Sequence, residues 1–143
     1  MSGPTSEVVL RDGRPEDVES VLALWRQAGA TPSVTDSVAA LRRVIEGGPA
    51  FLLLAEVEGL LVGSLIGSFD SWRGNLYRLA VRPDHRRRGI ARSLVAEAER
   101  RLTAQGARRI GAIVEQDHPL AMAFWAAVGY VQDPRLTRFV RNL

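Results

Sequence analysis

The sequence predicts a mixed α/β domain whose sheet is antiparallel except for one parallel pair of strands. Three observations indicate this class. Apolar residues recur at helical spacing in four segments, and three consecutive apolar runs are joined by short turns. A further helix separates the third run from a fourth, and a strand, a helix and a strand in that order form a parallel crossover unit. We expect one domain over residues 1–143, with residues 1–6 disordered.

The first third of the chain predicts one strand followed by two helices. Residues 7–11 (EVVLR) form a short apolar stretch suited to a strand. A helix begins at Pro15, because proline favours the first helical position and the acids after it complement the helix dipole. Gly29 ends this helix, whose core-facing residues are Val18, Val21, Leu22 and Trp25. A second helix ends at the sequence GGP and carries on one face Val38, Leu41 and Ile45.

The middle of the chain predicts three antiparallel strands. The segment AFLLLAEVEGLLVGSLIGSF contains two apolar runs, with Glu58 and Gly59 in a tight hairpin turn between them. DSWRG is a second turn, and NLYRLAV is a third strand. This strand ends at Arg82 and Pro83, because proline cannot donate to the ladder.

The last part of the chain predicts a long helix, a strand, a short helix and two short strands. The long helix runs from Gly89 to about Gln105, and its buried face consists of Ile90, Leu94, Val95, Ala98 and Leu102. RRIGAIV follows as a strand parallel to NLYRLAV. A fourth helix covers residues 119–128, and we expect the two last strands around Tyr130 and over residues 136–140.

Composition excludes several kinds of chemistry. All 19 basic residues are arginine, and the net charge is only +3, so lysine Schiff bases and a Walker-type phosphate lysine are excluded. Cysteine is absent, which removes thiol nucleophiles and thiolate metal sites. Because the two histidines and the scattered acids show no ligand spacing, we expect no metal. Without a signal peptide or a long apolar run, we expect a cytoplasmic protein with no membrane partner.

The stretch RRRGIARSL, residues 86–94, is the most informative motif. An arginine run of this kind is a nucleic-acid patch, a solvated helix face or a phosphate site. It lies between a strand and a helix, and the free N–H groups at a helix start favour an anion. Gly89 and Ala91 are small enough for a ligand to approach the backbone. We expect phosphate binding and no nucleic acid, since no aromatic residues are interleaved and acidic residues lie close by.

Two motifs together resemble the GNAT superfamily of N-acetyltransferases, in particular its small single-domain bacterial members. LAVRPDHRRRGIARSL is similar to the family's acetyl-CoA signature, and AMAFWAAVGY to its terminal helix pattern. The resemblance covers about residues 8–140. It implies a GNAT-like mixed fold whose elements follow one another along the chain in the order strand, two helices, three strands, helix, strand, helix and two strands. It also implies acetyl-CoA as co-substrate, bound by Leu79, Ala80, Val81, Arg86, Arg87, Arg88, Gly89, Ile90, Ala91, Arg92, His118 and Trp125.

The proton-handling positions of the family are substituted in this sequence. Trp125 stands where many members carry a tyrosine that protonates the departing thiolate, and Asn75 where some members carry a glutamate base. Neither side chain transfers protons usefully near neutral pH, so the sequence does not assign the catalytic acid or base. The candidates are Glu115, His118 and Tyr130. The alternative for His118 is that it, or Asp117, caps the helix that follows.

The resemblance also implies an amine acceptor. We expect its site to include the segment between the first two helices, the FDSWRG turn and the C-terminal QDPRLT segment. Asp70 is placed to hold an ammonium group and Arg73 a carboxylate, beside Trp72; alternatively, DSWRG is only a turn covered by the tryptophan.

The expected activity is acetyl-CoA-dependent transfer of an acetyl group directly to a primary amine of a small molecule, peptide or protein, by a monomer or homodimer. The alternative is a sensor that binds CoA or acyl-CoA with little or no catalysis, which the substitutions at Trp125 and Asn75 favour.

Overall fold

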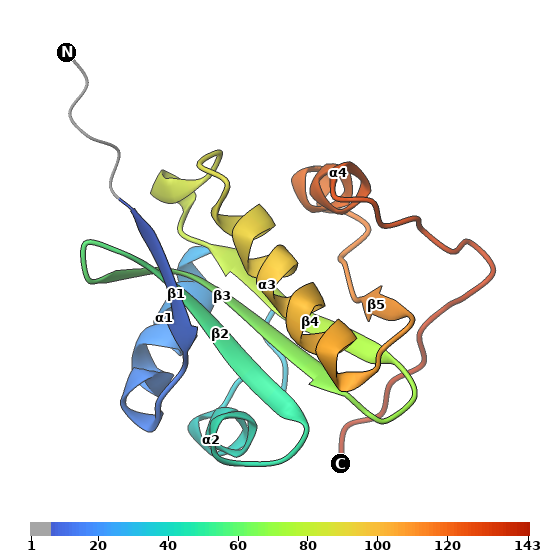
Figure 1. The fold of residues 1–143 in the computed structure, drawn as a ribbon, viewed down its shortest axis with the longest axis horizontal. Helices are drawn as coiled ribbons and strands as arrows, with labels where there is room; N and C mark the ends of the chain where they lie inside the picture. Colours follow the sequence, from blue (N-terminus) through green and yellow to red (C-terminus); the bar gives the residue numbers. More distant parts are fainter. Residues whose placement is uncertain (1–6) are drawn as a thin grey trace. The chain divides into compact units, whose positions relative to one another are not determined.

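A computed structural model describes residues 7–143, so the disorder expected for residues 1–6 lies outside the described residues. The strands are β1 (Val8–Asp12), β2 (Ala50–Val57), β3 (Leu60–Phe69), β4 (Gly74–Val81) and β5 (Ile110–Ala112). The helices are α1 (Val18–Gln27), α2 (Val38–Glu46), α3 (Ile90–Gln105) and α4 (Pro119–Ala127). Two short 3₁₀ turns, Pro15–Asp17 and Pro83–His85, precede α1 and α3. Each helix predicted from the sequence is therefore present (Figure 1).

The chain divides into two compact units, Met1–Ala112 and Ile113–Leu143. The first unit contains the whole sheet with α1, α2 and α3, and the second contains α4 and the segment that follows it. Within residues 7–143, no helix combines the length and the apolar character that crossing a membrane requires.

The five strands form one sheet in the order β1-β2-β3-β4-β5. The first three pairings are antiparallel, and β4 pairs with β5 in parallel. The mixed sheet predicted from the sequence is thus confirmed. At the tip of the β2–β3 hairpin, Glu58 and Gly59 have φ angles of 51° and 77°. This is the left-handed pair that a tight two-residue hairpin turn requires.

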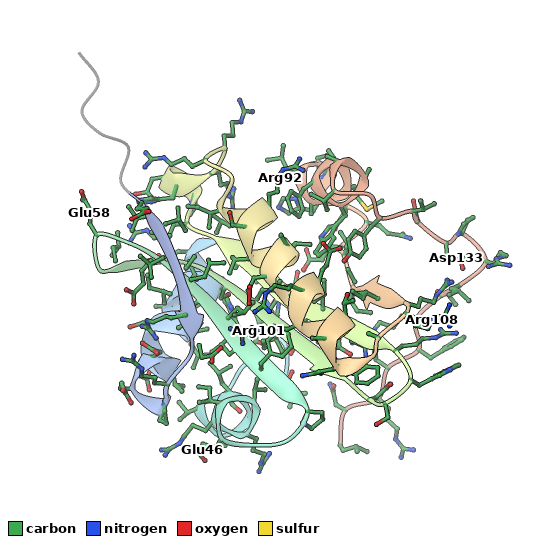
Figure 2. All side chains as sticks on the ribbon, viewed as in Figure 1. Glu46, Glu58, Arg92, Arg101, Arg108 and Asp133 are labelled. Carbon is green, nitrogen blue, oxygen red and sulfur yellow. The ribbon has the colours of Figure 1, made fainter. Side chains whose placement is uncertain are left out.

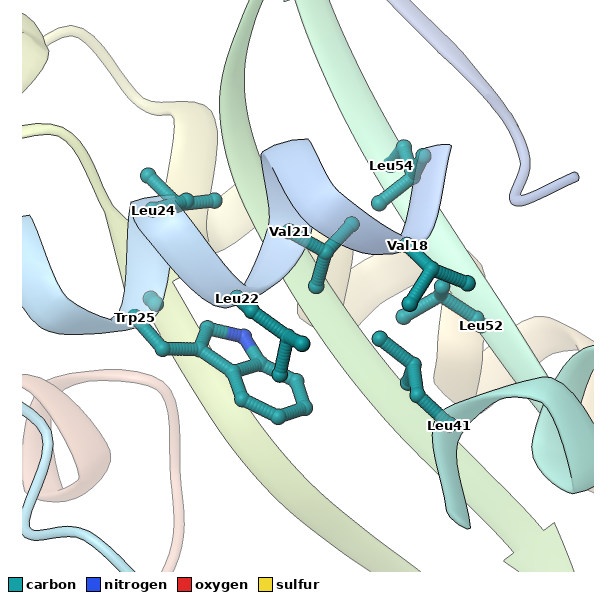
Figure 3. Close-up of a cluster of buried hydrophobic side chains, with 9 residues drawn as sticks. Val18, Val21, Leu22, Leu24, Trp25, Leu41, Leu52 and Leu54 are labelled. Atoms are coloured by element: carbon teal, nitrogen blue, oxygen red, sulfur yellow. The ribbon is translucent and has the colours of Figure 1, made fainter. Parts of the chain in front are cut away.

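Helices cover both faces of the sheet, with α1 and α2 on one face and α3 on the other (Figure 1). Neighbouring residues of a strand point to opposite faces of the sheet, so each strand contributes side chains to the packing on both faces. Leu52 and Leu54 pack into the cluster formed with α1 and α2 (Figure 3). The other members of this cluster from those helices are Val18, Val21, Leu22, Leu24, Trp25 and Leu41.

Helix α3 packs close to the sheet because β3 carries a glycine beneath it. A Cβ atom built on Gly63 would lie 3.0 Å from the side chain of Ile90 and 3.1 Å from that of Leu94. All five residues predicted for the inner face of α3 are buried, at 1% exposure or less. The helix ends at Gln105, as predicted, and Gly106 follows it in the left-handed conformation.

The sequence prediction of two strands around Tyr130 and over residues 136–140 differs from the structure. Residues 130–143 contain neither helix nor strand. Instead, the Asp133 carboxylate accepts a hydrogen bond from the backbone N–H of Arg135 and forms a turn at Pro134. Phe139 is 91% exposed. Apolar residues stabilise a strand only when a ladder partner is available, and residues 130–143 pair with no strand of the described sheet.

Candidate active site

The end of β4 offers an open strand edge. Pairing between β4 and β5 stops after three residue pairs, at Leu76 and Ala112. Beyond that point no strand of the described sheet lies beside β4 on this side, although Ala80 and Val81 still pair with β3 on the other. The backbone N–H and C=O groups of residues 77–81 that are not directed at β3 therefore face a position where an extended ligand can add to the sheet.

The loop between β4 and α3 is shaped to bind an anion. Arg87 and Gly89 both have left-handed backbones, with φ angles of 65° and 78°. Left-handed residues in such a turn direct successive N–H groups toward one point. Gly89 is the N-cap of α3, and a Cβ atom built on it would meet nothing within 4 Å. The first N–H groups of α3 have no intrahelical partner, and the helix dipole adds a positive potential there.

The arginines of this loop have different positions. The guanidinium of Arg86 donates a hydrogen bond to the carbonyl of Ala28, at the end of α1, with N···O 3.2 Å. Arg87 and Arg88 are exposed. Arg92, on the first turn of α3, is also exposed (Figure 2). All four arginines in residues 86–92 are exposed, and Arg86 in addition fixes the loop to α1.

Ile90 and Ala91 complete the segment predicted to bind the cofactor. Ile90 is 1% exposed and packs against β3, so only its backbone faces the loop. Ala91 is half-buried. The structure places residues 79–81 and 86–92 together at one end of the sheet, because α3 begins where β4 ends.

The predicted acceptor residues lie at the opposite end of β4. Asp70 Oδ1 accepts hydrogen bonds from the backbone N–H groups of Trp72 and Arg73, at 2.9 and 2.7 Å. These bonds, the one from Arg73 first, hold the pKa of Asp70 below its ordinary value. Arg73 covers the ring of the 72% exposed Trp72 at 4.1 Å. From Arg73 to Val81 is about 26 Å at a strand rise of about 3.3 Å per residue, so the two groups of residues are not brought together.

His118 caps α4. Its Nδ1 accepts a hydrogen bond from the backbone N–H of Ala121, at 3.1 Å. A nitrogen that accepts this bond carries no proton, so the other ring nitrogen, Nε2, carries it in the neutral side chain. Protonation of Nδ1 would break the cap. His118 is therefore the residue that caps α4, and Asp117 is exposed. The backbone carbonyl of Glu115 accepts a hydrogen bond from the backbone N–H of His118.

Trp125 lies in an aromatic cluster within the second unit. Its ring is edge-on to Phe124 at a centroid distance of 5.4 Å and to Tyr130 at 4.9 Å. Trp125 is 8% exposed, and its carbonyl accepts a hydrogen bond from the backbone N–H of Tyr130. Packing therefore fixes the orientation of both residues.

The sequence did not single out Arg78, which occupies a special place in β4. Its φ angle is 54°, in the left-handed region. Its guanidinium donates hydrogen bonds to the Thr31 carbonyl and to both carboxylate oxygens of Asp36, at 2.7–2.9 Å. A lone arginine in an apolar strand is a weak signal, and its partners are 42 and 47 positions away in the chain.

Comparison with known proteins agrees with this geometry. A model of the acetyltransferase (GNAT) family matches residues 19–130. An acetyltransferase of Pectobacterium atrosepticum is 34% identical over 121 residues, which cover 85% of this chain and 86% of that protein. An acetyltransferase of Yersinia enterocolitica is 31% identical over 121 residues, with the same coverage of both chains.

The chain belongs to the GNAT family of acetyltransferases.

Solved structures of low sequence identity share the GNAT fold. The aminoglycoside N-acetyltransferase AAC(6')-Iy, solved with CoA, has a TM-score of 0.82 at 17% identity, and the match covers 100% of both chains. The PaiA N-acetyltransferase of Thermoplasma acidophilum, solved with coenzyme A, has a TM-score of 0.79 at 18% identity, over 89% of this chain and 91% of that one. The family and the fold class predicted from the sequence are confirmed, as is the prediction of an acetyltransferase.

Proposed function

We propose that this GNAT protein transfers the acetyl group of acetyl-CoA directly to a primary amine of a small molecule, peptide or protein in the cytoplasm. The observation that carries the proposal is the continuity between the open edge of β4 and the anion-binding start of α3. We also propose that the two units form a single acetyltransferase domain, because the family match at residues 19–130 spans the boundary between them.

The residues at this end of the sheet fit acetyl-CoA. Its pyrophosphate suits the N–H groups at Gly89, Ile90 and Ala91, where a side chain at position 89 would otherwise take the open space. The exposed guanidinium groups of Arg87 and Arg88 offer charge-assisted hydrogen bonds to phosphate oxygens, as does that of Arg92. The pantetheine arm is an extended chain with amide groups. It suits the unpaired edge of residues 79–81 as an added strand would.

Acetyl-CoA supplies an activated acyl group, and the chain supplies position. Holding a thioester beside an amine provides roughly 7–11 kcal/mol of the barrier when the geometry is productive. A backbone N–H that polarises the carbonyl adds roughly 3–4 kcal/mol. Direct transfer therefore does not require a nucleophilic side chain, which agrees with a chain that has neither cysteine nor lysine.

The acceptor class is an amine whose site includes the connection between α1 and α2. Several structural neighbours are aminoglycoside N-acetyltransferases, one of them solved with a bisubstrate analogue that joins CoA to acetylneamine. These neighbours show the fold alone at 17–18% identity. We therefore propose only the class, a small or exposed primary amine.

A CoA sensor is the second candidate function. The buried aromatic cluster around Trp125 favours it, because the indole packs against Phe124 and Tyr130 and provides no acid for a departing thiolate. The capping role of His118 favours it too, because the cap occupies one ring nitrogen.

Incubation with acetyl-CoA and a panel of amines distinguishes the two functions. The panel contains aminoglycosides, polyamines, amino acids and peptides, and the readouts are release of free CoA and the mass of the acetylated product. Turnover of any amine supports the enzyme. Binding of CoA in the low micromolar range without turnover across the panel would support the sensor and refute the enzyme.

Gly89→Glu tests the proposed position of the CoA pyrophosphate. The added carboxylate would occupy the open space at the helix start and repel the pyrophosphate. We expect this variant to lose CoA binding and turnover together while it remains folded by circular dichroism. Retained affinity for CoA would refute the placement of the pyrophosphate.

A further inference from the structure

We propose that Arg78 is a positioning residue, which fixes the connection between α1 and α2 (residues 28–37) over the part of β4 that receives the acyl end of acetyl-CoA. The proposal rests on the proposed function, since it assigns the wall of the acceptor site. Arg78 acts through this connection and through no contact with the reacting atoms.

The proposed cofactor site gives the bound pantetheine arm a direction along β4. With the pyrophosphate at residues 87–92, the pantetheine runs back along the open edge of β4 from Val81 toward Leu79. The acyl end then lies beside the next residues along the strand, Arg78 and Tyr77. These residues come directly after the point where pairing with β5 stops. What packs over them decides how an amine approaches.

A β-bulge in β4 turns Arg78 toward α1 and α2. Strict alternation would place Gly74, Leu76, Arg78 and Ala80 on the α3 face of the sheet. Gly74 does face α3, since a Cβ atom there would lie 3.1 Å from Leu102. Ala80, however, belongs to the cluster of α1 and α2.

The pairing of β3 with β4 shifts register at this point, from Ile66 opposite Tyr77 to Ser64 opposite Ala80. One residue of β3 thus faces two residues of β4, Arg78 and Leu79, and the faces exchange there. Without the bulge, the Arg78 side chain would point to α3.

The guanidinium of Arg78 bonds to the connection between α1 and α2. Its Nη2 donates to the Thr31 carbonyl at 2.9 Å and to the two oxygens of Asp36 at 2.8 and 2.7 Å. The side chains of Arg78 and Asp36 are 20% and 18% exposed. The guanidinium also lies 5.3 Å from the centre of the Trp25 ring, at the end of α1. A partly buried ion pair of this kind holds its partners more firmly than a surface pair.

The backbone of Arg78 is itself held in place. The Ser64 hydroxyl, which is fully buried, donates to the Arg78 carbonyl at 3.2 Å and accepts from Trp25 Nε1 at 2.9 Å. A left-handed backbone at a residue with a long side chain costs about 1–3 kcal/mol and persists only where several contacts fix it. Here the carbonyl, the guanidinium and the strand pairing all do so.

The connection between α1 and α2 depends on these contacts from β4. Residues 28–37 form no helix or strand. Arg86 bonds to the Ala28 carbonyl at the start of the connection, Ser33, Thr35 and Asp36 form local hydrogen bonds within it, and Ser37 caps α2 at its end. Removal of the Arg78 side chain therefore removes the hydrogen bonds from β4 to Thr31 and Asp36 and loosens the connection, while the proposed cofactor contacts at Gly89 stay intact.

The test compares Arg78→Gly and Arg78→Lys with Arg42→Ala. Glycine accepts a φ of 54° without strain, so Arg78→Gly removes the side chain in a backbone that glycine favours. Arg42→Ala is the matched control, because it removes an arginine from an exposed ion pair with Glu46 on α2. Each variant is characterised by thermal unfolding, by CoA affinity and by steady-state kinetics with the best amine of the panel.

We expect Arg78→Gly to lower kcat/KM for the amine by about 10-fold or more, with the affinity for CoA within about 2-fold of the unaltered protein. Arg78→Lys is expected to recover part of this loss, because its ammonium retains the charge but ends one bond short of the Arg78 Nη2 that makes the contacts. Arg42→Ala is expected to match the unaltered protein. Equal losses for CoA and amine, or an unchanged kcat/KM for the amine, would overturn the positioning role.

Amide hydrogen exchange gives a readout that does not depend on activity. We expect faster exchange at residues 28–37 in Arg78→Gly than in the unaltered protein, and no change at residues 86–92. Unchanged exchange at residues 28–37 would overturn the proposal even if catalysis were lost. Absence of turnover by the unaltered protein with every amine would instead refute the proposed function, and exchange would still decide whether Arg78 holds the connection.

Discussion

Replacement of Gly89 by alanine tests whether the left-handed start of α3 is needed for stability and for CoA binding. Gly89 has φ 78° and ψ 9°, and a Cβ atom there would meet nothing within 4 Å. Any cost of Gly89→Ala is therefore conformational and not steric. Gly47 gives a matched control, because it too has open space around it but adopts an extended backbone, with φ −171°.

The difference between the two variants isolates the left-handed backbone. Alanine at a left-handed position costs about 1–2 kcal/mol. Each glycine-to-alanine change also restricts the unfolded chain, which stabilises the protein by about 0.4–1 kcal/mol. This second effect is common to both variants and cancels in the comparison. We expect Gly89→Ala to be less stable than Gly47→Ala by about 1–2 kcal/mol, or about 2–8 °C in Tm for a chain of this length.

Urea unfolding and CoA titration measure the two consequences. If alanine turns the N–H groups of the first helical turn away from the ligand, one charge-assisted hydrogen bond worth about 1.5–3 kcal/mol is lost. CoA affinity then falls about 10- to 100-fold in Gly89→Ala and stays unchanged in Gly47→Ala. Equal stability of the two variants would refute the conformational argument. Equal CoA affinity would refute the assignment of this backbone to the pyrophosphate.

Three further results are expected. Trp25→Phe removes the buried hydrogen bond to Ser64 and should cost about 1–3 kcal/mol of unfolding free energy in urea; a loss below about 0.5 kcal/mol would contradict this. His118→Ala should lose about 1 kcal/mol with the helix cap, whereas His118→Asn, which can cap, should keep both stability and the pH–rate profile. A profile that loses a limb in His118→Asn would identify a histidine base. Arg11 holds the pKa of Asp17 below its ordinary value, mainly through a hydrogen bond. This stabilisation is present above about pH 3.9 and is lost as the pH falls through the lowered value, so acid unfolding should be less steep in Asp17→Asn.

The helices and the sheet could be predicted because the sequence marks them locally. The inner face of α3 follows from one apolar period, and Gly106 marks its end through a backbone that only glycine adopts easily. The strands expected around Tyr130 and over residues 136–140 rested on short local apolar stretches, yet residues 130–143 are not in strands. A strand depends on a partner that a local apolar stretch does not supply. The bulge at Arg78 had no local signal either, since it depends on pairing with β3.

In the candidate site, too, some features could be predicted from the sequence and others could not. The loop proposed to bind the pyrophosphate depends on backbone conformation, and Gly89 after a proline-ended strand is visible in the sequence. The roles of His118 and Asp70 depend on which atoms their side chains reach. Both turn out to accept local backbone N–H groups, and the sequence had left this alternative open for each. Arg78 reaches across 42 positions to Asp36, and no spacing rule predicts such a pair.

The use of arginine in place of lysine has a chemical consequence for an acetyltransferase. The guanidinium of Arg11 joins Asp17 to Glu56, with Nη1 and Nη2 donating to the two oxygens of Asp17 and Nε donating to Glu56. A lysine ammonium lacks the planar fork that makes such contacts. A guanidinium also stays protonated near neutral pH and is no acceptor for an acetyl group, whereas a lysine beside a thioester is a competing amine. The cations that shape this site are therefore ones that its own co-substrate leaves unmodified, and Arg78, beside the inferred acyl end, is the position where this matters most.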